Sequence, residues 1–117
     1  MEDSILKSTK KVLSVPPDYE AFDQDIITYI NSAFSVLHQL GVGPSTTFYI
    51  EDDSSEWDDL DLNDNQLGLV KSYIGLKVRM LFDPPSTSFV IEAVNNMIQE
   101  HEHRLVASAE LTKLNDT

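Results

Sequence analysis

The sequence contains no cysteine, and this absence excludes disulfide bonds, thiolate metal sites and a cysteine nucleophile. No apolar run approaches the roughly 18 residues that a membrane-spanning helix needs, and the first residues lack the apolar stretch of a secretory signal. Basic residues are scarce, with 8 against 20 acids, which gives a net charge of −12. Because such a chain repels phosphate backbones and acidic membranes, we expect its partners to be proteins.

Acidic residues are concentrated in one stretch, residues 51–64, which contains no base. The acids in it are Glu51, Asp52, Asp53, Glu56, Asp58, Asp59, Asp61 and Asp64. The pattern predicts a long acidic loop over residues 43–64, in which residues 46–50 (TTFYI) form a short strand-like segment and Trp57 and Leu60 pack inward. A connection of this length is typically functional or disordered, and the aromatic residue favours partial order.

The acidic loop does not have the pattern of an EF-hand calcium site. An alternating acidic series starts at Asp59, but Asp64 stands where the calcium loop requires glycine. Val70 stands where a bidentate glutamate belongs. Weak, nonspecific binding of divalent cations stays open, and a solvated acidic arm is the simpler interpretation.

Two helices are predicted before the acidic loop. Residues 4–15 form a short helix with Lys7, Lys10 and Lys11 on its outside, and two prolines then end it. An aspartate at position 18 is expected to cap the second helix, and a glycine at position 41 to end it. Apolar residues recur at helical spacing between these two positions: Phe22, Ile26, Ile30, Ala33, Leu37 and Leu40.

The third predicted helix, residues 65–82, is apolar on two sides. One stripe consists of Leu67, Val70, Ile74, Val78 and Leu81, and the other of Leu69, Tyr73, Leu76 and Met80. A helix of this kind is central in a fold or shared between subunits. Gly68 and Gly75 lie two turns apart on one face, which allows another helix to approach closely.

A rigid corner follows the third helix, because Asp83 precedes Pro84 and Pro85 and is held out of the helical region. The fourth predicted helix has the apolar residues Phe89, Val94, Met97, Ile98 and Leu105. We expect one helical domain over residues 1–106 and a flexible tail over 107–117. The predicted fold class is all-α, a small bundle of about four helices with a long acidic loop.

No arrangement of residues predicts catalysis. His101 and His103 are two residues apart on a predicted helix and therefore face different directions, unlike the two histidines of a zinc-binding helix. The sequence has neither a glycine-rich phosphate loop nor a nucleophile elbow. We therefore expect a protein that is not an enzyme and that has no cofactor.

Residues for contacts with other proteins come from four places: the acidic loop, the basic residues of the third helix, the proline corner and the polar end of the fourth helix. They are Trp57, Asp58, Asp59, Lys71, Lys77, Arg79, Asp83, Pro84, Pro85, His101, His103 and Arg104. The three bases of the third helix either face acids of a partner or lie on a solvated face, and the sequence favours neither interpretation.

Three stretches resemble the small head–tail connector, or adaptor, proteins of long-tailed bacteriophages and prophages. They are SILKSTKKVL at 4–13, DIITYINSAFSVLHQLGVGP at 25–44 and LGLVKSYIGLKVRMLFDPPSTSFVIEA at 67–93. The most specific pieces are QLGVGP at 39–44 and KVRMLFDPP at 77–85. One position departs from the family pattern, because His103 stands where relatives carry an aromatic residue before the arginine of the last helix.

The resemblance implies a structural protein of the virion, made in the cytoplasm of the bacterial host. Its subunits would form a ring, by family analogy a dodecamer, docked on the portal protein at the head–tail junction. The ring would extend the channel through which the genome DNA passes, without binding it specifically, and would offer a surface to the next connector or tail protein.

An alternative from a different class is an acidic regulatory protein, such as a DNA mimic that inhibits a basic partner. Closely spaced acids can imitate phosphates. DNA mimics, however, spread their acids over the whole surface, whereas two-thirds of the net charge here lies in residues 51–64.

Overall fold

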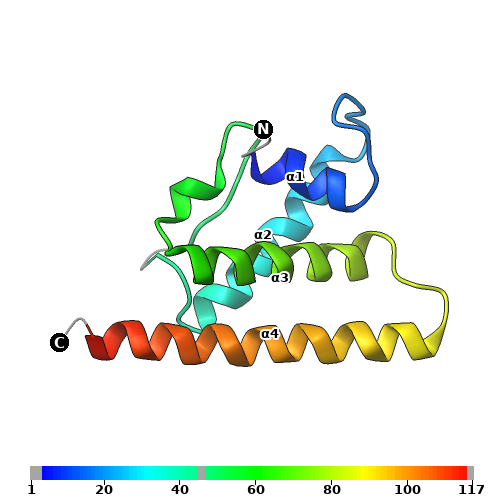
Figure 1. Ribbon diagram of the computed structural model, residues 1–117. Helices are drawn as coiled ribbons and strands as arrows, with labels where there is room; N and C mark the ends of the chain where they lie inside the picture. The colour runs from blue at the N-terminus through cyan, green and yellow to red at the C-terminus, as the bar shows by residue number, and fades with distance from the viewer. Residues whose placement is uncertain (1–3, 45–46, 116–117) are drawn as a thin grey trace.

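Four α-helices and one short 3₁₀-helix make up the fold within residues 4–44 and 47–115, which are the residues that the computed structural model describes (Figure 1). The α-helices are α1 (Ile5–Val12), α2 (Asp23–Gln39), α3 (Asp64–Phe82) and α4 (Ser88–Asn115), and the 3₁₀-helix is η1 (Trp57–Leu60). These residues contain no strand. The predicted all-α bundle of about four helices is therefore confirmed.

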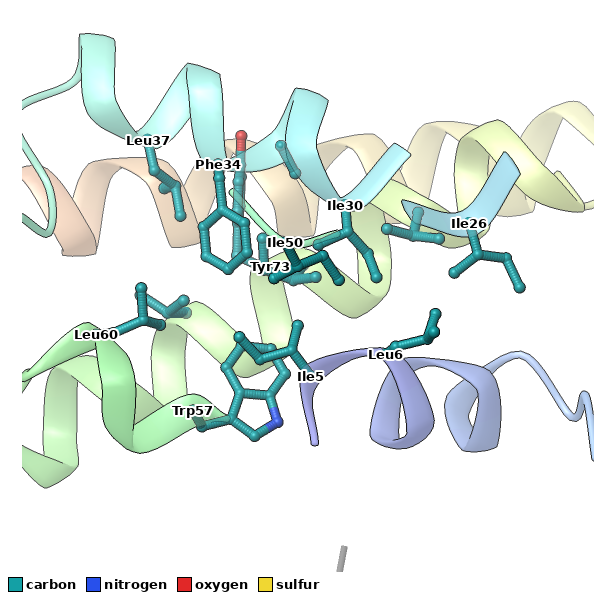
Figure 2. Close-up of a cluster of buried hydrophobic side chains, with 14 of the residues drawn as sticks. Ile5, Leu6, Ile26, Ile30, Phe34, Leu37, Ile50, Trp57, Leu60 and Tyr73 are labelled. Atoms are coloured by element: carbon teal, nitrogen blue, oxygen red, sulfur yellow. The ribbon is translucent and has the colours of Figure 1, made fainter. Parts of the chain in front are cut away.

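The helix α3 lies at the centre of the bundle. It packs against α1, α2 and α4, and Figure 1 shows it between α1 and the long α4, with α2 crossing behind it. Figure 2 shows apolar side chains of α1, α2, η1 and α3 converging on one core, together with Ile50 from the loop. The two apolar sides of α3 are thus used within the subunit, so the central position is the one that the structure adopts.

Lys10 is buried, with 1% of its surface exposed, although the sequence pattern predicts it on the outside of α1. Its ammonium donates to the carbonyl oxygens of Pro17, at 3.1 Å, and Tyr19, at 2.7 Å, and lies 2.7 Å from a carboxylate oxygen of Asp23. The prediction was wrong because the segment after α1 folds back over Lys10. Helical periodicity carries no information about such a contact.

The helix α2 begins later than the sequence predicts. Asp18 does not cap it; Phe22 occupies the N-cap position without a side-chain hydrogen bond, and the helix starts at Asp23. Residues 16–22 are instead used to surround Lys10, which delays the start of the helix. Asp23 and Asp25 nevertheless lie in the first turn, where the helix dipole favours negative charge.

The end of α2 follows the prediction. Gly41 has a φ of 81°, in the left-handed region that glycine adopts without strain. Its N–H donates to His38 O at 3.0 Å, and the N–H of Val42 donates to Leu37 O at 2.9 Å. This pair of bonds is the Schellman motif, and the buried side chain of Val42 completes it.

The strand-like segment of the acidic loop is not a strand. Thr46 lies outside the described residues, and residues 47–50 are irregular, without a neighbouring strand to pair with. The backbone of Ile50 is instead held by one side chain of α2: Asn31 donates its amide N–H to Ile50 O at 3.0 Å and accepts from Ile50 N–H at 2.8 Å. Because both backbone groups are satisfied in this way, the segment stays ordered without a sheet.

Only one of the two glycines predicted to allow close packing does so. A Cβ on Gly75 would lie 3.4 Å from Val12 Cγ1, so α1 approaches α3 closely at this point. A Cβ on Gly68 would have no atom within 4 Å, and the prediction was wrong there. Gly68 is near the start of α3, where it is exposed.

The helix α4 runs antiparallel to α3 after the proline corner and extends to Asn115 (Figure 1). Ile98 and Leu105 are buried against the bundle and Val94 is partly buried, whereas Phe89 and Met97 are exposed. The predicted division at residue 107 stays a prediction. The structure adds that the backbone of residues 107–115 continues as helix, because nothing in this stretch breaks it.

Tyr73 connects α3 to α4 by a partly buried hydrogen bond, its hydroxyl donating to a carboxylate oxygen of Glu102 at 2.7 Å. Burial, reinforced by the hydrogen bond and the charge of Glu102, raises the pKa of Tyr73 well above its usual range. The folded state therefore keeps this proton at a pH at which the unfolded chain loses it. Stability is fully present below the pKa of a free tyrosine, about 10, and falls as the pH rises above it.

We expect Tyr73→Phe to lower the free energy of unfolding by about 1 kcal/mol at neutral pH, because the hydrogen bond is lost and the packing is kept. This difference should shrink above about pH 10, since the variant lacks the titrating group. Urea unfolding at pH 7.5 and pH 10.5 measures both. Tyr49→Phe, on the surface, is the control and should match the wild type. An equal effect of Tyr73→Phe at both pH values would contradict the assignment.

Candidate interaction surface

An open groove lies where α1, α3 and α4 meet. Its apolar lining consists of Val12, Gly75, Leu76 and Met97, and its polar lining of Lys71, Ser72, Arg79 and His101. We call this set of residues the basic groove. Its volume is about 360 Å³. This is near the lower end of the roughly 300 to 1,000 Å³ of pockets for drug-sized ligands, so there is room for one or two side chains of a partner.

The spacing of residues on the two helices builds the groove. Lys71, Gly75 and Arg79 follow one another at intervals of four on α3, and Met97 and His101 do the same on α4, so each set shares one face of its helix. The missing side chain of Gly75 leaves a hollow between the two cations, which Val12 borders from α1. The groove is therefore a fixed feature of packed helices.

Three side chains give the groove its basic character. The Lys71 ammonium lies 5.8 Å from the centre of the Trp57 ring, within cation–π distance. Arg79 is exposed and forms no ion pair within the described part of the chain. A ring nitrogen of His101, Nδ1, lies 2.8 Å from the carbonyl oxygen of Met97. Two cations and an imidazole thus surround an apolar floor.

Lys77 is separate from this group, although the sequence places it in one basic cluster with Lys71 and Arg79. It does not line the groove, and its ammonium lies 6.0 Å from the centre of the Tyr73 ring. Six residues along a helix turn a side chain to a different face from Lys71, which explains the separation. The structure brings His101 to the groove in its place.

Trp57 is buried and anchors the acidic loop to the core. It is 5% exposed, and its indole N–H donates to Ser8 Oγ in α1 at 2.8 Å (Figure 2). Leu60 is buried beside it, so the predicted inward packing of both residues is confirmed. Asp58 and Asp59 are exposed on η1, and the Asp59 carboxylate accepts a hydrogen bond from the N–H of Glu56 at 2.9 Å. Asp58 is therefore the freer of the two acids for an external contact.

A second surface was missed by the sequence prediction. It consists of the exposed side chains of Tyr49, Glu51 and Asp52, at the border of a shallow depression that Ser54 and Ser55 also line. We call these three exposed side chains the acidic knob. Hydrogen bonds from the hydroxyl and the N–H of Ser54 lower the pKa of Asp52 from its ordinary value. The alternation of Phe48, Tyr49 and Ile50 carries a signal for the knob, because every second residue points outward in an extended segment.

The remaining predicted contact residues lie outside the basic groove. Asp83 and Pro84 are exposed and Pro85 is half-buried in the corner, and the N–H of Asp83 closes α3 by donating to Arg79 O at 2.9 Å. His103 and Arg104 are exposed on α4. They do not line the groove that His101 faces.

Metal sites and membrane spans were sought in the same residues. In the described part of the chain, no group of three or more His, Cys, Asp or Glu side chains is placed to hold a metal ion. Within the same residues, no helix combines the length and the apolar character that crossing a membrane requires.

A scan against protein-family models matches residues 5–112 to the family described as phage connector protein. The chain belongs to the phage connector family. The match extends from the first residue of α1 into the last turns of α4, so it covers all four helices and both of the surfaces described above. Searches of curated proteins and of solved structures each found no match.

Membership of this family confirms the resemblance seen in the sequence. Phage connectors are structural proteins of the phage particle, and their partners are other proteins of the head and the tail. The exposed groove and knob of this connector are therefore candidates for protein contacts.

Proposed function

We propose that this connector is a subunit of a ring that docks on the portal protein and joins the phage head to the tail. The observation that carries the proposal is the family match over residues 5–112 of 117. The ring extends the channel of the portal and presents its far side to the next connector or to a tail protein. Its role is structural and needs no cofactor.

The charge of the chain suits a channel for DNA. The net charge is −12, and the acids of residues 51–64 include the exposed side chains of Asp58, Asp61 and Asp64. Acidic walls release no counterions from the DNA backbone, and they therefore give DNA no site at which to bind as it passes. A connector of this charge transmits the genome without retaining it.

Co-expression with the portal protein of the same phage genome tests the proposal. Electron microscopy of the purified complex should show a closed ring of connector subunits on one end of the portal. A bare portal beside a monomeric connector would overturn the proposal. A tight one-to-one complex with a basic protein would instead favour an acidic regulatory protein or DNA mimic.

A further inference from the structure

Tyr49 is an aromatic side chain that the fold holds on the surface. It is 60% exposed, whereas both of its neighbours point inward. Phe48 packs edge-to-face on Phe34, with ring centres 5.1 Å apart, and Ile50 is buried and held through its backbone by Asn31. These contacts fix the backbone on both sides of Tyr49, so little backbone freedom is lost when a partner covers the ring, which favours binding.

Two carboxylates share a depression with the exposed ring of Tyr49. Glu51 and Asp52 line this depression and are exposed, and hydrogen bonds from Ser54 lower the pKa of Asp52. The neighbouring Asp53 lies 3.5 Å from Lys7 Nζ and is thus partly neutralised within the chain. The acidic knob is therefore an aromatic ring with two negative charges in its depression that form no ion pair with the residues that the structure describes.

The basic groove has the complementary character. Its floor is apolar, with the exposed side chains of Val12 and Met97, and its rim carries Lys71 and Arg79. An aromatic side chain covers such a floor, and carboxylates beside it reach the two cations, which are well suited to carboxylate pairing. The knob supplies both groups.

The groove and the knob are separate surfaces of one subunit. Two cavities border the knob, one lined by Tyr49, Glu51 and Asp52 and the other by Glu51, Asp52 and Leu6 of α1. None of these residues lines the groove, where α1 contributes Val12. Two complementary surfaces that do not overlap make a head-to-tail contact, and repetition of that contact gives a ring when the rotation closes.

We propose that the basic groove of one subunit binds the acidic knob of the next subunit, with Tyr49 on the apolar floor and Glu51 and Asp52 against Lys71 and Arg79. This proposal rests on the ring proposed above and assigns the surfaces that form it. The exposed Leu111 of α4 is another apolar side chain that could enter the groove. It has a single described acid beside it, Glu110, and so complements two cations less well.

Paired charge reversals test the contact. A groove-reversed variant carries Lys71→Glu and Arg79→Glu, and a knob-reversed variant carries Glu51→Lys and Asp52→Lys. The control, Lys11→Glu, reverses an exposed charge of α1 that lies outside both surfaces. Circular dichroism confirms that each variant keeps its helical content, since the reversed residues are at the surface.

Each reversed variant, mixed alone with portal, should fill the ring at least about tenfold less well than the wild type at equal concentration, because two close charge pairs become repulsive. An equimolar mixture of the two reversed variants should restore the ring. When the two variants alternate around the ring, every groove meets a knob of opposite charge. Native mass spectrometry of the ring should therefore find equal numbers of the groove-reversed and the knob-reversed subunits. The control should assemble as the wild type does.

Two results would overturn the contact. Reversed variants that form rings as well as the wild type exclude these surfaces, while the ring itself stands. A mixture that fails to assemble excludes the pairing of groove and knob, and would point to the portal as the occupant of the groove. If the wild-type connector leaves the portal bare, the proposed function fails instead. Sedimentation velocity without portal then decides the contact, since self-association should be lost in each variant and regained in the mixture.

Discussion

Replacing Lys10 with methionine should lower the free energy of unfolding by about 3 kcal/mol. The ammonium is buried and hydrogen-bonds to the carbonyl oxygens of Pro17 and Tyr19 while pairing with the Asp23 carboxylate. Removal of one partner from a buried ion pair costs about 3–5 kcal/mol, because the other charge is left uncompensated. Asp23 retains some contact with solvent, with its side chain 23% exposed, so we expect the lower end of this range.

Lys11→Met is the matched control, since Lys11 is the next residue of α1 and is exposed. A surface substitution of this kind changes stability by less than about 0.5 kcal/mol. Adding Asp23→Leu to Lys10→Met should recover part of the loss, because the uncompensated carboxylate is removed. Urea unfolding followed by circular dichroism measures all four proteins. Unfolding of Lys10→Met at the wild-type midpoint would contradict the role given to the ion pair.

Replacing Trp57 with alanine should lower the free energy of unfolding by about 3–4 kcal/mol. Truncation of a buried tryptophan removes the largest apolar side chain of the loop from the core and leaves a cavity, which typically costs about 3–5 kcal/mol. It also leaves Ser8 of α1 without the hydrogen bond from the indole N–H. The loss separates the acidic loop from α1, so hydrogen exchange should accelerate most in residues 51–62.

Trp57→Phe divides the effect into its two parts. Phenylalanine keeps an aromatic ring in the core but cannot donate to Ser8, and we expect a loss of about 1–2 kcal/mol, from the hydrogen bond and from the smaller ring. Asp58→Ala, one residue further along η1 and exposed, is the control and should be close to the wild type. If Trp57→Ala stayed within 1 kcal/mol of the wild type, the tryptophan would not be the anchor of the loop.

Periodicity in the sequence was sufficient to predict the four α-helices and their order, although the cap predicted at Asp18 was wrong. The apolar stripes of α2 and α3 are properties of consecutive residues, and so is the glycine that ends α2 with a φ of 81°. Trp57 and Leu60 were also predicted correctly, because large apolar residues in an acidic loop have few ways to avoid water. These features depend on local chemistry, which a sequence contains in full.

Three of the errors concern contacts between residues that are not adjacent in the sequence. Lys10 is polar and looks like a surface residue until the backbone of residues 17–19 folds over it. Residues 47–50 have the composition of a strand, but one amide side chain, Asn31, replaces the partner strand. The late start of α2 at Asp23 has the same origin, since Asp23 pairs with the lysine. Helical spacing cannot report any of these pairings.

The interaction surfaces were predicted in part. The sequence identified Lys71, Arg79 and His101 as separate candidates, and the structure brings them to one groove because α4 lies antiparallel to α3. Gly75 was predicted as a site of close packing, which it is, but its effect on the shape of the groove depends on Val12. Tyr49 was overlooked because an exposed aromatic residue gains meaning only when its neighbours are known to point inward.

Deletion of the gene from the phage genome that encodes this connector tests the central claim most directly, with electron microscopy of the lysate as the measurement. We expect heads and tails in normal numbers but unjoined, with complete particles restored when the connector is supplied from a plasmid. Complete, infectious particles in the absence of the connector would contradict the claim that it joins head to tail.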